Sequence, residues 1–297
     1  MWLALAAALL ADSTQDLRVV VWRAESLHVV TAGRGDPVVL VPGLFGSAFG
    51  FRKLVPLLTG AGYRTIIVEP LGIGSSSRPE HADYSLGAQT ERVAAVLDSL
   101  RVQDAFVVGH SMGGAIAFRL AFRHPALVRA LISIESGPTE AAATPAFRRA
   151  MRFAPWIKIF GGIRLIRRLI RRNLISSSGD TTWITDSVVT GYTAGAAAHL
   201  DATLKAFLGM AAARERYKLE PHLAEIRCPV RLVVGGARHD GDVGAAEVVL
   251  LRGRVHVFAL DSVPGVGHYP QEERPQSVLD AVARARVSTA GAPRRGE

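Results

Sequence analysis

Short runs rich in valine and isoleucine alternate along this sequence with stretches whose apolar residues recur at helical spacing. This alternation limits the fold more than any other feature. The runs include "DPVVLVPG", "RTIIVEP", "DAFVVGH", "RALISIES" and "PVRLVVGG". Runs that are apolar throughout are typical of strands covered on both faces. Strands that alternate with helices predict an α/β fold, with a mostly parallel central sheet and helices on both faces.

Two segments depart from the alternation. Residues 17–32 contain two apolar runs with no helix between them, which predicts an antiparallel hairpin at the edge of the sheet. Residues 137–221 show helical patterns but no convincing strand, which predicts a helical cap inserted into a core formed by 17–136 and 222–288.

The two ends of the chain differ in character. Residues 1–16 begin with eleven apolar residues, too few to span a bilayer, and no lysine or arginine precedes them as in a secretory signal. We expect a packed or frayed helix there and a cytoplasmic protein, with export or membrane association as the alternative. Residues 289–297 are small and polar and are predicted to be disordered.

The stretch "VVGHSMGGAIAF" places one hydroxyl between a predicted strand and a predicted helix. It contains the pattern G-x-S-x-G, formed by Gly109, Ser111 and Gly113. A sharp strand-to-helix turn strains the serine backbone and needs nearly absent side chains two residues away. The turn also exposes the hydroxyl at a helix N-terminus, where developing negative charge is favoured. Ser111 is therefore predicted to be a nucleophile.

A serine nucleophile needs a base, and the base needs a carboxylate that orients it. Asp240 and His268 follow the last two predicted strands, in "GGARHDGDV" and "VPGVGHYPQEE". The carboxyl ends of parallel strands gather at one edge of the sheet, so these side chains are candidates for the acid and the base. Asp242 and Glu135, which ends "LISIE", remain alternative acids.

The chain order serine, aspartate, histidine and the motifs "VPGLFGS", "EPLGIGSSSRP", "GHSMGG" and "GVGHYPQEERPQSV" resemble the α/β-hydrolase fold family over residues 27–286. Within that family the sequence looks like a member of the branch of small bacterial serine esterases, lipases and related hydrolases. The resemblance implies an oxyanion hole made by the backbone N–H groups of Met112 and Leu44, with Phe45 as the neighbouring alternative. The haloalkane dehalogenases and epoxide hydrolases of this fold use an aspartate nucleophile, which Ser111 argues against.

Two positions depart from the family pattern. The family commonly has His-Gly in the loop that carries the first oxyanion donor, whereas this chain has Pro42-Gly43. Gly43 is retained, so the loop geometry is expected to survive. The family usually has aspartate where this chain has Glu69, at a position that is normally structural.

Basic residues are concentrated in one part of the chain. The net charge is +9, and between residues 141 and 179 there are nine lysines or arginines and no acidic residue, so the rest of the chain is balanced. In residues 147–175 arginines alternate with apolar residues at helical spacing. We expect a lid whose apolar side covers the active site. The alternative is an amphipathic surface for anionic membranes or an acidic carrier. The cluster has no nucleic-acid-binding motif, and no nucleic acid is expected as a partner.

These observations predict a serine hydrolase (EC 3.1.1.-) that cleaves a carboxylic ester or a similar, hydrophobic small-molecule acyl substrate. The chemistry requires no metal and no organic cofactor, and the single cysteine, Cys228, is expected to be a small buried residue. Two alternatives remain: an acyltransferase that uses the same acyl-enzyme, and a non-catalytic ligand-binding member of the fold.

Overall fold

The computed structural model describes residues 14–22, 25–143, 145–151, 161–239 and 241–289. The predictions for the N-terminal segment, for the middle of the basic stretch and for Asp240 therefore lie outside the described residues. Among the described residues, no helix combines the length and apolarity needed to cross a membrane.

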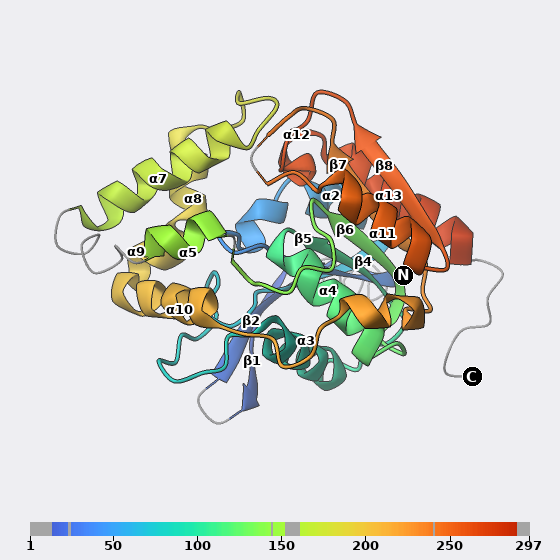
Figure 1. The fold of residues 1–297 in the computed structure, drawn as a ribbon. Helices are drawn as coiled ribbons and strands as arrows, with labels where there is room; N and C mark the ends of the chain where they lie inside the picture. The colour runs from blue at the N-terminus through green and yellow to red at the C-terminus, as the bar shows by residue number, and fades with distance from the viewer. Residues whose placement is uncertain (1–13, 23–24, 144, 152–160, 240, 290–297) are drawn as a thin grey trace, which may run out of the picture.

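Eight strands form one sheet in the order β1-β2-β4-β3-β5-β6-β7-β8 (Figure 1). The hairpin of β1 and β2 pairs antiparallel and joins β4 antiparallel, and every other neighbouring pair is parallel. The predicted mostly parallel α/β sheet with an antiparallel edge hairpin is therefore confirmed. The strands are β1 Gln15–Trp22, β2 Glu25–Ala32, β3 Asp36–Val41, β4 Tyr63–Val68, β5 Ala105–His110, β6 Val128–Ile134, β7 Val230–Gly235 and β8 Phe258–Val263.

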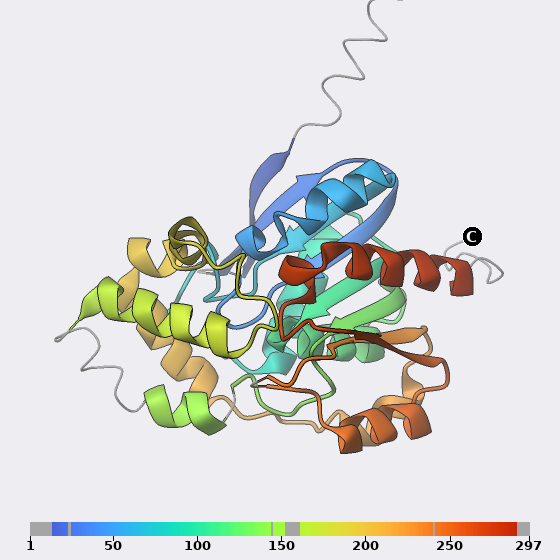
Figure 2. The same cartoon turned by 90° about the horizontal axis from the view of Figure 1, so that it is seen from above.

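Helices cover both faces of the sheet, as the view from above shows (Figure 2). In β3, Val38 and Leu40 pack on the face covered by α2 and α13, while Val39 and Val41 pack on the face covered by α3 and α4. This burial of both faces explains why the strand is apolar from Pro37 to Val41. The helices of the core are α2 Leu54–Gly60, α3 Leu86–Ser99, α4 Met112–Arg123, α11 Ala245–Arg254, α12 Pro270–Glu273 and α13 Pro275–Thr289, with the 3-10 turns η1 Ala48–Phe51 and η2 Glu220–Glu225.

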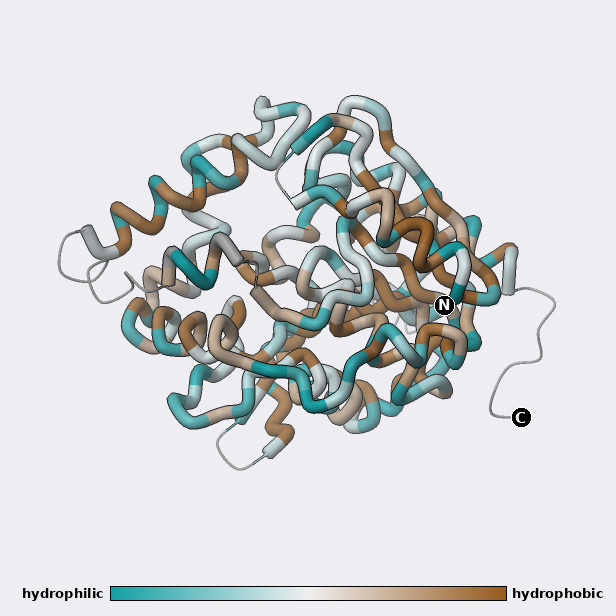
Figure 3. Tube along the Cα trace, in the orientation of Figure 1, coloured by the Kyte–Doolittle hydropathy of each residue, from teal (hydrophilic) through white to brown (hydrophobic). Residues whose placement is uncertain are grey.

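The segment between β6 and β7 holds five helices in its described part, and they gather at one side of the sheet (Figure 1). We call them the inserted helices: α5 Pro145–Met151, α7 Gly162–Ser176, α8 Asp186–Tyr192, α9 Ala194–Ala198 and α10 Leu200–Ala212. Apolar and polar residues alternate along α7 (Figure 3). Arg164, Arg168 and Arg172 lie exposed on this helix.

Several element boundaries differ from the sequence expectations. Strand β1 begins at Gln15, before the predicted start of the core, because pairing with β2 continues to Thr31. The turn η2 crosses the predicted border at residues 221 and 222. Helix α13 continues through Thr289, the first residue of the predicted tail, whose hydroxyl bonds the carbonyl of Ala285 at 3.3 Å.

Candidate active site

Ser111 stands between the end of β5 and the start of α4 in a strained backbone conformation, with φ 53° and ψ −122°. A non-glycine residue at positive φ is uncommon and persists where its surroundings hold it. The Ser111 N–H donates to the carbonyl of Ile134 at 2.9 Å, and its own carbonyl accepts the N–H of Gly114 at 2.8 Å. The turn that the sequence predicts from the glycines is therefore fixed by the neighbouring strand and by the first turn of the helix.

The three glycines named from the sequence stand at close backbone approaches. A Cβ on Gly109 would collide with the carbonyl of Gly113, and a Cβ on Gly113 would collide with the carbonyl of Val41. A Cβ on Gly43 would lie 3.0 Å from Cβ of Ser111. The loop after β3 therefore packs directly against the serine.

Three backbone donors lie free beside the serine. Among the described residues, the N–H groups of Leu44, Phe45 and Met112 donate no hydrogen bond. Met112 is the first residue of α4, where helix N–H groups have no partner within the helix. Leu44 follows Gly43, which touches Ser111. This arrangement suits an oxyanion hole, which needs two unpaired donors aimed at one oxygen.

Glu69 fixes the far end of the loop after β3. Its Oε1 accepts the N–H of Ala48 at 2.7 Å, and its Oε2 accepts the N–H of Ser75 at 2.6 Å. His28 Nδ1 lies 2.8 Å from the same Oε2. The glutamate is 2% exposed, so these bonds satisfy a buried carboxylate, and its role here is structural.

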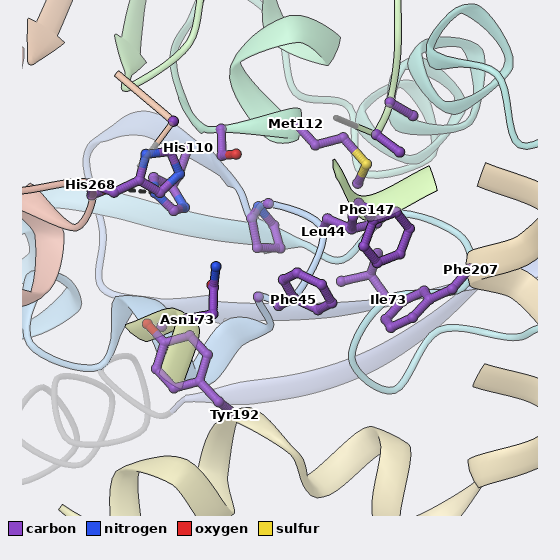
Figure 4. A pocket seen from close by; sticks show the side chains of 18 of the residues that line it. Leu44, Phe45, Ile73, His110, Met112, Phe147, Asn173, Tyr192, Phe207 and His268 are labelled. Carbon is purple, nitrogen blue, oxygen red and sulfur yellow. Dashed lines mark hydrogen bonds between the residues drawn. The ribbon is translucent and has the colours of Figure 1, made fainter. Parts of the chain in front are cut away.

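His268 lies in the loop after β8, on a backbone that is held from two sides. Its N–H donates to the carbonyl of Ser177, at the end of α7, at 2.7 Å. Its carbonyl accepts a bond from His110 Nε2 at 2.8 Å, drawn as a dashed line in Figure 4. Burial lowers the pKa of His110 to about 4, so this ring is a neutral N–H donor at neutral pH. Sequence reasoning did not identify His110, although it sits inside the serine motif.

The loop of His268 is also tied to the inserted helices through Glu273. The carboxylate of Glu273 accepts the N–H of Gly267 at 3.1 Å, and those of Gly179 and Asp180 at 3.0 and 2.7 Å. A Cβ on Gly267 would collide with the carbonyl of Ser177. The end of α7 and the backbone of the histidine thus form one hydrogen-bonded unit.

Glu135 is the described carboxylate that faces His268. It follows β6 at φ 49°, its side chain is fully buried, and its Oε2 lies 3.9 Å from His268 Nδ1. Among the described residues, this Nδ1 has no hydrogen-bond partner. Oε1 of Glu135 accepts the N–H of Gly235, in β7. Burial raises the pKa of Glu135 to about 7, and burial together with the neighbouring His110 and His239 lowers the pKa of His268 well below its ordinary value.

His239 is a buried neighbour that sequence reasoning missed. Its Nε2 lies 3.2 Å from Oε2 of Glu135, and its Nδ1 lies 2.7 Å from Oδ1 of Asp242. Asp242, an alternative acid from the sequence, therefore pairs with His239 rather than with His268. Asp240 lies outside the described residues, and its assignment as the acid stays a prediction. The next residue, Gly241, stands beside the His268 ring. The position of His239 after a strand, next to Asp240, was the available signal.

Comparisons with known proteins agree with this architecture. A family model described as "alpha/beta hydrolase fold" matches residues 36–156. An uncharacterized hydrolase of Bacillus subtilis is 27% identical over 86% of this chain and 91% of its own. The solved structure of an epoxide hydrolase, CorEH, superposes with a TM-score of 0.77 at 20% identity, over 93% of this chain and 99% of that one. Residues 36–156 thus match the α/β-hydrolase family model, and the chain as described has the α/β-hydrolase fold.

Other curated relatives share only one region with this chain. Bifunctional epoxide hydrolase 2 of Rattus norvegicus is 33% identical over 111 residues, which are 37% of this chain but 20% of that protein. The chain thus spans about a fifth of the length of such relatives.

A cavity of about 1300 Å³ opens between the sheet and the inserted helices. Ser111, Glu135 and His268 line it together with Leu44 and Met112. His110 and His268 lie at one end in Figure 4, and Asn173 and Tyr192 face the space from the inserted helices. The predicted nucleophile, the base and both oxyanion donors thus border one space.

The other end of the cavity is aromatic and apolar (Figure 4). The rings of Phe45, Phe147 and Phe207 meet edge to face, with centroids 5.4 to 5.9 Å apart. Ile73 and Met112 border the same region in Figure 4. Such a surface gains free energy by burying an apolar group of a ligand.

Proposed function

We propose that this α/β-hydrolase is a serine hydrolase of the esterase and lipase type, which cleaves a carboxylic ester or a similar acyl compound with an apolar acyl group. One observation carries the proposal. Ser111, held at φ 53° on a strand-to-helix turn, borders the same cavity as the partly buried His268. A serine on a strained turn that shares a cavity with a histidine is the arrangement that nucleophilic acyl transfer needs.

The reaction proceeds through an acyl-enzyme in this proposal. His268 Nε2 accepts the proton of Ser111 Oγ as the oxygen attacks the carbonyl carbon. The carbonyl oxygen becomes negative and receives hydrogen bonds from the N–H groups of Leu44 and Met112. His268 then returns the proton to the departing alcohol oxygen as the C–O bond breaks. Water, deprotonated by the same ring, attacks the acyl-enzyme and releases the acid and Ser111.

Glu135 is the acid that the described geometry supports. Its carboxylate faces His268 Nδ1 across 3.9 Å, and an approach of about 1 Å would make a hydrogen bond. Catalytic hydrogen bonds are often long without substrate and shorten in the complex. A carboxylate at Nδ1 fixes the ring tautomer and stabilises the imidazolium that forms during attack. Asp240 is the alternative acid from the sequence.

The chemistry of serine separates this proposal from epoxide hydrolysis, the activity that some relatives are named for. An aspartate that opens an epoxide leaves an ester, which water then cleaves. Ser111 would leave an ether at the same step, and the enzyme could not turn over by hydrolysis. The aromatic and apolar lining at one end of the cavity favours an acyl chain over a sugar as the bound group.

Two measurements test the proposal. A fluorophosphonate probe should label the folded protein at Ser111, identified by peptide mass spectrometry, and Ser111→Ala should abolish labelling. A panel of p-nitrophenyl esters of increasing acyl length should show turnover that Ser111→Ala lacks. Product partition between water and an added alcohol or thiol distinguishes a hydrolase from an acyltransferase. Absence of both labelling and turnover would favour a non-catalytic, ligand-binding protein.

A further inference from the structure

We propose that Glu135, His239 and His268 form a binding site for a divalent transition metal, with Zn²⁺ as the favoured ion, and that the bound ion inhibits the enzyme. The inhibition rests on the function proposed above, whereas metal binding does not. The residues come from the ends of three neighbouring strands, β6, β7 and β8, so the sheet itself brings them together.

The three candidate ligand atoms already lie close together. They are Oε2 of Glu135, Nε2 of His239 and Nδ1 of His268, all within 4.8 Å of one another. The carboxylate oxygen lies 3.2 Å from His239 and 3.9 Å from His268. Ligands around a tetrahedral zinc ion with bonds of about 2.0–2.1 Å are about 3.3 Å apart. A closure of up to about 1.5 Å between ligand atoms would bring all three to the spacing of a tetrahedral site, whose fourth position stays open.

His268 Nδ1 supplies a second, independent observation. The atom is buried and has no hydrogen-bond partner among the described residues, yet it points into the cluster. A buried nitrogen without a partner costs free energy, and a metal ion would satisfy it. The pairing of two histidines with one carboxylate is typical of catalytic and regulatory zinc ligands.

An ion can reach the cluster from the substrate cavity. Glu135 and His268 both border that cavity, as do Gly241 and Asp242. The side chain of Asp242 is 46% exposed and contacts His239, so it places negative charge at the entrance. The ion would replace the contact of His239 with Glu135 by bonds to both side chains.

The inhibition follows from the tautomer of His268. A neutral imidazole bound to metal through Nδ1 carries its proton on Nε2. Nε2 then has no lone pair to accept the proton of Ser111, and the Glu135 carboxylate is held by the ion. The serine keeps its proton, and the first step of the proposed reaction stops.

Binding is measured on full-length protein carrying Ser111→Ala, after treatment with EDTA, by isothermal titration with ZnCl₂ and by the absorption of bound Co²⁺. We expect one ion per chain and a tetrahedral Co²⁺ spectrum without a thiolate band. His239→Gln should weaken binding at least tenfold. His222→Gln is the matched control, because His222 pairs with Glu225 at 2.7 Å on the surface. Equal affinities of the two variants, or no binding, would overturn the site.

A crystal soaked in ZnCl₂ gives a readout that does not depend on a variant. Anomalous scattering should place the ion about 2 Å from all three ligand atoms, and an ion found only elsewhere would refute the assignment. In the native enzyme, Zn²⁺ should suppress ester hydrolysis, EDTA should restore it, and Mg²⁺ should have no effect. Binding without inhibition would remove the regulatory half of the proposal. Binding in a protein that hydrolyses no ester would leave the metal site standing and reject the proposed function.

Discussion

Nδ1 of His268 lies 3.9 Å from Oε2 of Glu135, a carboxylate that stands at the end of β6 and far from the histidine in sequence. Among the described residues, no other group competes for that nitrogen. The same oxygen of Glu135 lies 3.2 Å from His239. One buried carboxylate therefore lies near two rings, and of the two only His268 lines the cavity that Ser111 borders.

Replacing Glu135 should separate the candidate acids. We expect Glu135→Gln to lower kcat for p-nitrophenyl esters by on the order of 10³–10⁴, because the amide cannot stabilise the imidazolium. The kcat of Asp242→Asn should stay within a few-fold of that of the native enzyme, because Asp242 contacts His239 and not His268. Steady-state kinetics on purified variants with matching melting temperatures would measure this. A large loss in Asp240→Asn with an active Glu135→Gln would assign the acid to Asp240 instead.

The pH dependence of kcat/KM should reflect the ionisation of Glu135. Burial raises the pKa of Glu135 to about 7, opposed by the Gly235 N–H and by His239, while burial lowers that of His268. Activity requires the ionised carboxylate, so kcat/KM should rise as pH increases through about 7. The His268 ring is already neutral there. The rise near 7 should disappear from the residual activity of Glu135→Gln, and its persistence in that variant would assign it to another group.

Gly43→Ala should damage the oxyanion hole without unfolding the protein. The added Cβ would lie 3.0 Å from Ser111 Cβ and 3.1 Å from the His110 carbonyl, so the loop with Leu44 must shift. Loss of one oxyanion donor costs roughly 10²–10³ in kcat. Gly60→Ala is the control, because a Cβ there meets nothing within 4 Å. Kinetics and thermal melts would be compared, and native kcat in Gly43→Ala would argue against this loop as a donor.

Phe207→Ala should shorten the preferred acyl chain. Phe207 packs edge to face on Phe45 at the apolar end of the cavity, and each buried CH₂ contributes about 0.8 kcal/mol. We expect kcat/KM for p-nitrophenyl octanoate to fall by about tenfold or more. The value for p-nitrophenyl acetate should change little. Leu208→Ala, on the same helix but 39% exposed, should behave as native. Parallel losses on both esters would place the acyl chain elsewhere.

The exposed arginines of α7 make the membrane alternative from the sequence testable. We propose that Arg164, Arg168 and Arg172 bring the protein to anionic lipid surfaces, where each basic residue contributes about 1 kcal/mol. Replacement of all three by glutamine should weaken binding to phosphatidylserine vesicles by roughly a hundredfold. Arg252→Gln with Arg254→Gln, on α11, is the control. If the native protein shows no salt-sensitive sedimentation with such vesicles, the membrane proposal fails.

The nucleophile and the sheet could be predicted from the sequence because their signals are local. Gly109 and Gly113 predict the turn at Ser111, because their lack of a side chain permits close contacts with neighbouring backbone. Strand β3 is apolar after Asp36 because both of its faces are covered, and that pattern is visible in the sequence alone.

The carboxylate that lies nearest to His268 could not be predicted from such local signals. Glu135 reaches the histidine because β6 and β8 both flank β7, which fixes their strand ends relative to each other. In the loop after β7, the backbone conformation decides which side chain turns inward, and His239 is buried while Asp242 is half exposed. Several adjacent polar residues in one loop give no periodic signal that separates them.

The bond from His268 N–H to the Ser177 carbonyl, reinforced through Glu273, has a mechanical consequence for access to the cavity. Any movement of α7 away from the sheet would pull on the main chain of His268, the proposed general base. In the proposed mechanism, an open position of α7 would displace this ring, and catalysis would need the helix to return over the bound substrate. Substrate entry and catalysis would then alternate, coupled through these hydrogen bonds.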